Sequence, residues 1–137
     1  MAELSWFFEI ENKVFTRVQY NLKKKHSELH CTTKNENFSS ETGLPNVFPT
    51  LYLHMLPSAE VGKDIEGSSI NAVLSGIEID VYTNTTESEC KQIINDAVLA
   101  MKSMRFSVIA FPVTVTRNGV SQSIARFRRV VGSEDTL

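Results

Sequence analysis

Apolar residues recur at helical spacing near the start of the chain. From 7 to 22 they follow one another at steps of three, four and seven residues, in two neighbouring stripes. The pattern predicts a helix with a wide buried face that begins with Ser5 as its N-cap and ends near His26. Three lysines at 23–25 favour this end, because cations stabilise the negative end of a helix dipole.

A second helical pattern runs from Thr86 to Met104. Thr86 and Glu89 form a capping box, in which the side chain of each residue bonds to the backbone N–H of the other. The residues that follow predict one apolar face packed against a core. They are Cys90, Ile93, Ile94, Ala97, Val98, Met101 and Met104.

Alternating apolar and polar positions predict strands in the middle of the chain. We expect a short strand at 29–33, a longer one at 49–56 that Pro57 ends, and a third at 69–83. In the third, apolar residues change from even to odd positions. This change predicts a β-bulge near 75–76, or an arm that leaves the domain.

The last third of the chain predicts a β-hairpin. Its turn is the Asn-Gly dipeptide at 118–119, which suits the positive φ angles of a type I′ turn. Pro112 predicts that the first strand is an edge strand or is bulged. In the return strand at 120–131, odd-numbered apolar residues alternate with Arg126 and Arg128, so the two sets face opposite sides of the sheet.

The order of these elements predicts an α+β fold. We expect a mostly antiparallel sheet of about four or five strands with two helices packed on one face. A long inter-strand loop or arm is expected at 58–67. A chain of 137 residues suits one domain over 1–137, with a mobile C-terminal tail at about 132–137.

Charge is unevenly distributed along the chain. The net charge of -2 argues against a protein that binds nucleic acid through overall charge. Between Ala97 and Ser133, however, there are basic residues and no acidic one, whereas the 58–67 loop carries acidic residues. Separate acidic and basic surfaces would let copies of the chain pair, and ordinary solvated surfaces are the alternative.

The basic return strand suggests a contact with DNA. Arg126, Arg128 and Arg129 are candidates to line a ring lumen and to contact phosphates without reading sequence. The competing interpretation, of equal weight, is that they pair with Glu78 and Asp80 on the polar face of the sheet.

Catalytic motifs are absent from the sequence, so we expect neither an enzyme nor a cofactor. There is no G-x-S-x-G, no Walker A, no H-E-x-x-H and no cysteine pair at zinc spacing. His26, His30 and Cys31 lack a fourth ligand, so no metal site is predicted. Cys31 and Cys90 are expected to be reduced thiols.

The sequence also predicts no association with a membrane. The first residues lack the basic region and cleavage site of a signal peptide. No apolar run approaches the roughly 20 residues needed to cross a bilayer.

Five stretches together span nearly the whole chain and carry a family resemblance. They are Ser5-Trp6-Phe7, LPNVFPT at 44–50, GKDIEG at 62–67, MKSMRF at 101–106 and IARFRRVVG at 124–132. They resemble small tail-terminator, or tail-completion, proteins of tailed phages that infect Gram-positive bacteria and of related prophages. Such proteins are structural components of the virion and are assembled in the host cytoplasm.

The resemblance implies a hexameric ring on the head-proximal end of the tail tube. The ring would stop tube polymerisation and join the head, so the expected partners are other copies of the chain, the tail tube protein and the head-tail connector or stopper. DNA in the lumen is a further, non-specific contact. The arm that touches the neighbouring subunit would include Glu60, Lys63, Asp64, Glu66 and Gly67.

Three other function classes remain open at this point. A head-completion or stopper protein of the neck would share the same virion context. A nucleic-acid-binding module that uses its sheet is more remote, since no strand shows the aromatic pair that such sheets use for stacking. An enzyme with an unrecognised site is disfavoured, because no nucleophile, base and orienting group can be assembled.

Overall fold

The computed structural model describes residues 4–35, 38–61 and 71–137. Its helices are α1 (Ser5–Phe8), α2 (Ile10–Lys23) and α3 (Glu87–Ser103), and its strands are β1 (His30–Thr32), β2 (Thr50–Val61), β3 (Ala72–Thr83), β4 (Ser107–Arg117) and β5 (Val120–Gly132). The strands form one sheet in the order β1-β2-β3-β5-β4, in which β1 and β2 are parallel and the other pairs antiparallel. The predicted α+β fold is confirmed.

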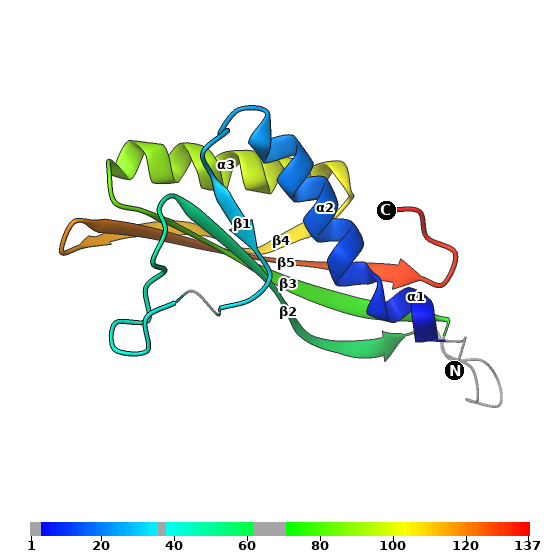
Figure 1. The fold of residues 1–137 in the computed structure, drawn as a ribbon. Helices are drawn as coiled ribbons and strands as arrows, with labels where there is room; N and C mark the ends of the chain where they lie inside the picture. The colour runs from blue at the N-terminus through cyan, green and yellow to red at the C-terminus, as the bar shows by residue number, and fades with distance from the viewer. Residues whose placement is uncertain (1–3, 36–37, 62–70) are drawn as a thin grey trace.

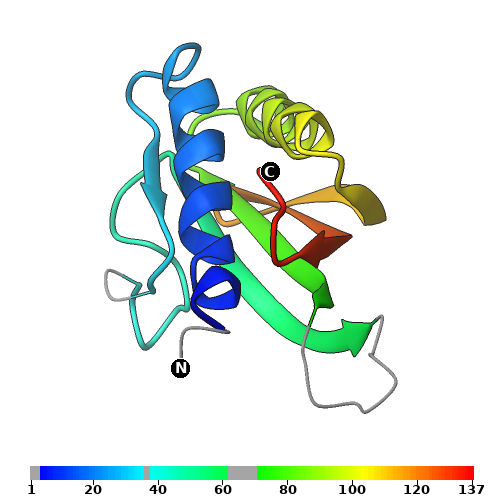
Figure 2. The same cartoon turned by 90° about the vertical axis from the view of Figure 1, so that its right-hand side faces the viewer.

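Both long helices cover the same face of the sheet (Figures 1 and 2). The buried side of α2 consists of Ile10, Val14, Val18 and Leu22, at the predicted spacing. The apolar side of α3 packs beside it, and both helices meet odd-numbered residues of the central strands. These include Leu51, Leu53, Ile77, Ile79, Val81, Ala125 and Phe127, all buried. Each fully buried aliphatic side chain contributes roughly 1.5–3 kcal/mol, so this layer is the main source of stability.

The two helices differ in how well their ends were predicted. Thr86 is the N-cap of α3, and its side chain accepts a hydrogen bond from the Glu89 N–H, as the capping box predicts. The prediction for the first helix was less accurate. Ser5 is its first helical residue and Leu4 occupies the N-cap position, the helix is interrupted at Glu9, and α2 ends at Lys23.

Two predictions about the middle strands were wrong. Pro57 does not end its strand, because β2 continues to Val61. The bulge lies in β2 and not in β3: Leu56 pairs with Gly76 and Ala59 with Leu74, so β2 advances by three residues while β3 advances by two. Proline is tolerated here because β1 borders only the first residues of β2, and beyond them proline's missing N–H interrupts no ladder on that edge.

The C-terminal hairpin agrees with the sequence pattern. Asn118 and Gly119 both have positive φ angles, and β4 and β5 pair on either side of them. β4 is an edge strand whose register shifts twice around Pro112, as the proline predicts. In β5, Ala125 and Phe127 are buried under the helices while alternate residues face the other way.

The end of the chain contacts the rest of the domain, and the mobility predicted for the tail at about 132–137 stays a prediction. Asp135 lies 2.9 Å from the buried Arg129 guanidinium and 3.5 Å from that of Arg105. Arg17 of α2 donates a hydrogen bond to the Leu137 carbonyl, and Leu137 packs against the core. The segment therefore folds back from β5 towards the helices (Figure 2).

Substitution Asp135→Asn should destabilise the protein. Burial acts to raise the pKa of Asp135, but hydrogen bonds from the Leu137 N–H and Arg129 outweigh it and hold the pKa below its usual value. A lowered pKa means that the pair stabilises the fold above the ordinary aspartate pKa and that this contribution is lost as pH falls. We expect a loss of about 2 kcal/mol at neutral pH, because Arg129 keeps a buried charge without its partner.

Urea denaturation at neutral and at acidic pH measures this contribution. Glu134→Gln is the matched control, since Glu134 is an exposed neighbour. Equal stabilities of the Asp135 variant and the control at neutral pH would contradict the proposed role of the pair.

Candidate functional site

The face of the sheet opposite the helices, here called the open face, carries an ordered set of polar residues. Antiparallel pairing of β2, β3 and β5 aligns their even-numbered residues in cross-strand rows. His54, Glu78 and Arg126 form one row. Tyr52, Asp80 and Ile124 form the next. Charged groups from three strands therefore meet at the centre of the sheet.

Glu78 is held by its two cross-strand neighbours. Arg126 donates from Nε to Oε1 of Glu78 at 2.7 Å, and His54 Nε2 lies 2.8 Å from Oε2. Burial acts to raise the pKa of Glu78, but the hydrogen bonds with Arg126, Asp80 and His54 outweigh it and lower the pKa below its ordinary value. Glu78 is therefore an anion within the fold.

Asp80 lies beside this anion, and its carboxyl group has fewer hydrogen-bond partners than that of Glu78. Its residue is 7% exposed, and its Oδ1 has no hydrogen-bond partner among the residues that the structure describes. Its Oδ2 is 4.0 Å from His54 Nε2. Burial, followed by the charge and hydrogen bond of Glu78, raises the pKa of Asp80 to about 8, against a smaller opposing effect of Arg126. Burial beside the Glu78 anion therefore favours the protonated form of Asp80.

Aromatic rings border one side of the carboxylates. Tyr52 stacks on His54, with ring centroids 4.6 Å apart, and Phe38 packs against both Tyr52 and Tyr82. Gln122 donates a hydrogen bond to the Tyr82 hydroxyl. No local pattern predicts that Phe38 contacts both Tyr52 and Tyr82. Because Phe38 packs on both rings, the pair is engaged within the chain, which disfavours base stacking on this sheet.

One cluster on the open face has the composition of a metal site. His54, Glu78 and Asp80 each offer a ligand atom, and these atoms lie within 4.8 Å of one another. Glu78 and Asp80 were predicted to lie on the polar face of a strand, and His54 was not grouped with them. The sequence pattern does place His54 at a polar position of an alternating strand. It does not specify the register between β2 and β3 that brings His54 next to Glu78.

The three arginines predicted to line a lumen do not lie together. Arg126 pairs with Glu78, as the competing interpretation predicted, and keeps its side chain half exposed. Arg128 is exposed on the open face. Arg129 was wrongly grouped with them: its odd position turns its side chain to the helix side, where Asp135 binds it.

The predicted subunit-contact arm is only partly described. Glu60 is exposed near the end of β2 and pairs with Val73, so residues 58–61 belong to a strand and not to a loop. The four other predicted contact residues lie outside the described residues. They are Lys63, Asp64, Glu66 and Gly67.

Large apolar side chains are exposed along the edge of the sheet. Phe111 is 76% exposed and Val113 is 70% exposed, both on β4. Val115 follows on β4, and Ile124 on β5 pairs with Val113 across the strands. We call these four residues the β4 apolar surface. A group of exposed large apolar side chains along one strand is typical of a protein contact site.

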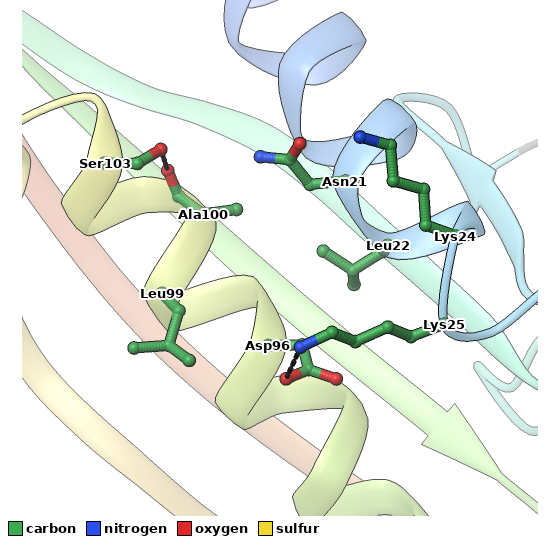
Figure 3. Close-up of a pocket in the computed structure, with 8 residues that line it drawn as sticks. All are labelled: Asn21, Leu22, Lys24, Lys25, Asp96, Leu99, Ala100 and Ser103. Carbon is green, nitrogen blue, oxygen red and sulfur yellow. Dashed lines mark hydrogen bonds and ion pairs between the residues drawn. The ribbon is translucent and has the colours of Figure 1, made fainter.

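The helix side offers a shallow groove instead. It lies between α2 and α3, has a volume of about 280 Å³, and is lined by Lys24, Lys25, Asp96 and Leu99 among others (Figure 3). Asp96 is held by Lys25 and by His26, whose Nε2 lies 2.7 Å from Oδ2. His26 is thus paired across the two helices, and the described residues contain no metal-compatible cluster that joins it to His30 and Cys31.

Both cysteines are free and buried. Burial raises the pKa of each thiol to about 11, with a smaller opposing effect of Lys23 on Cys31 and of a hydrogen bond with Thr83 on Cys90. Neutral thiols are poor nucleophiles and poor metal ligands. Each cysteine therefore acts as a small apolar side chain of the core.

Comparison with known proteins adds no family to this description. No protein-family model matches the chain, and no curated protein matches it. Within the described ranges, no helix is long and apolar enough to cross a membrane. Inference about function therefore depends on the surfaces of the open face.

Asp80→Asn should stabilise the protein in chelator-treated buffer. Asparagine has nearly the same shape as protonated aspartate, and, unlike Asp80, it needs neither to take up a proton nor to bury a charge beside Glu78 when the chain folds. We expect an increase of about 1–2 kcal/mol in the free energy of unfolding at pH 7.5, measured by urea denaturation. Glu41→Gln, at an exposed loop position, is the control. A loss of stability in the Asp80 variant would show that the ionised carboxylate is itself required.

Proposed function

We propose that the protein is a ring-forming tail terminator of a tailed phage. In this role it caps the head-proximal end of the tail tube, stops its polymerisation and offers a surface for head joining. The observation that carries the proposal is the β4 apolar surface, an exposed group of large side chains on a sheet that has helices on one face only. The resemblance of five sequence stretches to such proteins gives the surface its virion context.

The edge strand supports a contact through side chains more than through strand addition. Two register shifts and Pro112 interrupt the regular hydrogen-bonding edge of β4, and such features keep edge strands from pairing with another sheet. Burial of apolar area stabilises a contact by about 25 cal/mol per Å² before the costs of association. Phe111 and Val113 are the most exposed members and would supply most of this area.

A ring needs two different surfaces that meet head to tail. An interface of this kind gives a finite ring when the rotation closes, and a filament when it does not. In the proposal, the β4 apolar surface of one copy meets the neighbouring copy, and the acidic Glu60, exposed near the end of β2, meets a basic side chain of that copy. Charge complementarity of this type fixes orientation more than it adds affinity.

A DNA contact in the lumen would rest on Arg126 and Arg128. Both lie on the open face, and Arg128 is fully available to a phosphate because it is exposed. Arg129 is excluded from this role, because it is bound to Asp135 on the opposite side. Phosphate contacts need no base recognition, so base stacking on Tyr52 and Tyr82 is not required.

Removal of the gene from its phage or prophage tests the proposal directly. A terminator's loss should give overlong tail tubes without attached heads, seen as a broad upward shift of tail lengths in electron micrographs of the lysate. Tails of normal length beside unattached heads would instead identify a head-side stopper, the alternative that shares this context.

Complementation with variants links the phenotype to the β4 apolar surface. Val113→Glu places a charge in the proposed contact and should fail to restore normal tail length, although the purified variant melts as the wild type does. Leu99→Glu is the matched control, because Leu99 is also an exposed apolar residue but lies on α3. The proposed role of the β4 apolar surface is contradicted if Val113→Glu restores normal tail length. It is also contradicted if both variants fail to restore it.

A further inference from the structure

We propose that His54, Glu78 and Asp80 bind one divalent transition-metal ion of the zinc class on the open face. His54 Nε2 lies 2.8 Å from Glu78 Oε2 and 4.0 Å from Asp80 Oδ2. Metal bonds of about 2.0–2.2 Å place neighbouring ligand atoms about 3.3–3.5 Å apart in a tetrahedral shell. The two separations from His54 lie on either side of that value, and all three ligand atoms lie within 4.8 Å of one another, so the cluster has the dimensions of a site for one ion after side-chain rotation.

The donor set selects the class of ion. One imidazole nitrogen and two carboxylate oxygens suit zinc and its neighbours in the first transition row. Magnesium and calcium prefer shells of oxygen only, with six or more ligands. His54 keeps part of its side chain exposed, so a fourth position can be filled by water from the solvent side.

An unpaired buried atom of Asp80 supports a cation at the cluster. Oδ1 of Asp80 is buried and has no hydrogen-bond partner among the described residues. The nearest charged residue on the same strand, Glu78, is also a carboxylate and so cannot compensate its charge. A buried polar atom left without a partner costs about 1–3 kcal/mol. A cation bound by both oxygens of Asp80 neutralises the two carboxylates and satisfies Oδ1, whereas a proton on Asp80 is the competing way to relieve the same repulsion.

The neighbouring side chains orient the ligands as outer-shell groups do in metal sites. Arg126 holds Oε1 of Glu78, which leaves Oε2 directed at His54. Tyr52 stacks on the His54 ring with an interplanar angle of 18° and fixes the plane of the imidazole. Such support raises metal affinity because the ligands lose little freedom on binding.

Zinc titration of the apo protein tests the site. The full chain is freed of metal with a chelator, dialysed with a reducing agent and titrated with Zn²⁺ alone by calorimetry. We expect one ion per chain. His54→Gln should weaken binding about 100-fold and Asp80→Asn at least about 10-fold, while millimolar Mg²⁺ should not compete.

His26→Gln is the matched control, because His26 is also partly buried and lies against a carboxylate, that of Asp96, without a second one in the cluster. Its zinc affinity should equal that of the wild type. The proposal is overturned if the wild type takes up no zinc, or if His26→Gln and His54→Gln weaken binding equally. If His54→Gln does not fold, Asp80→Asn still decides the test. Wild-type zinc affinity in Asp80→Asn would show that Asp80 binds no metal and that a proton alone relieves the repulsion at the cluster. The test is independent of phage assembly, so its failure leaves the tail-terminator proposal untouched.

Discussion

The packing of α2 and α3 against one face of β3 is the constraint on which the other features depend. Side chains in a strand alternate between faces, so covering one face assigns the odd residues of β3 to the core and leaves the even ones to the open face. Glu78 and Asp80 are even residues of the central strand. They therefore lie on the open face, outside the apolar layer under the helices. Both are nevertheless buried, because neighbouring side chains of the open face cover them.

Two adjacent carboxylates at the centre of a sheet are costly for a fold. Replacement of buried charges by apolar side chains of similar size is often neutral or stabilising. Arg126 and His54 compensate Glu78, but Asp80 remains short of partners. The arrangement is thus poorly explained by stability alone, and it is well explained if a cation or a second molecule uses the open face.

Features encoded by short stretches of sequence were predicted well. The capping box at Thr86, the Asn-Gly turn and the edge strand marked by Pro112 each depend on a few consecutive residues. Features that depend on register were missed. The bulge was placed in β3 because its apolar residues seemed to change phase, whereas the extra residue lies in β2. The pairing of His54 with Glu78 depends on how two distant strands align, which local patterns do not specify.

Arg129 shows that one error was avoidable. Strand alternation alone predicts that Arg129 lies on the other face of the sheet from Arg126 and Arg128. Its partner Asp135 lies in the segment that was predicted to be mobile. The same alternation has a consequence for how the protein changes over generations. Odd positions of β5 such as Ala125 and Phe127 are constrained by the core, whereas the exposed even positions Ile124 and Arg128 are constrained by what the open face meets. Substitutions at Ile124 and Arg128 can therefore alter partner choice while the fold itself stays fixed, whereas substitution of Arg126 also removes the partner of Glu78.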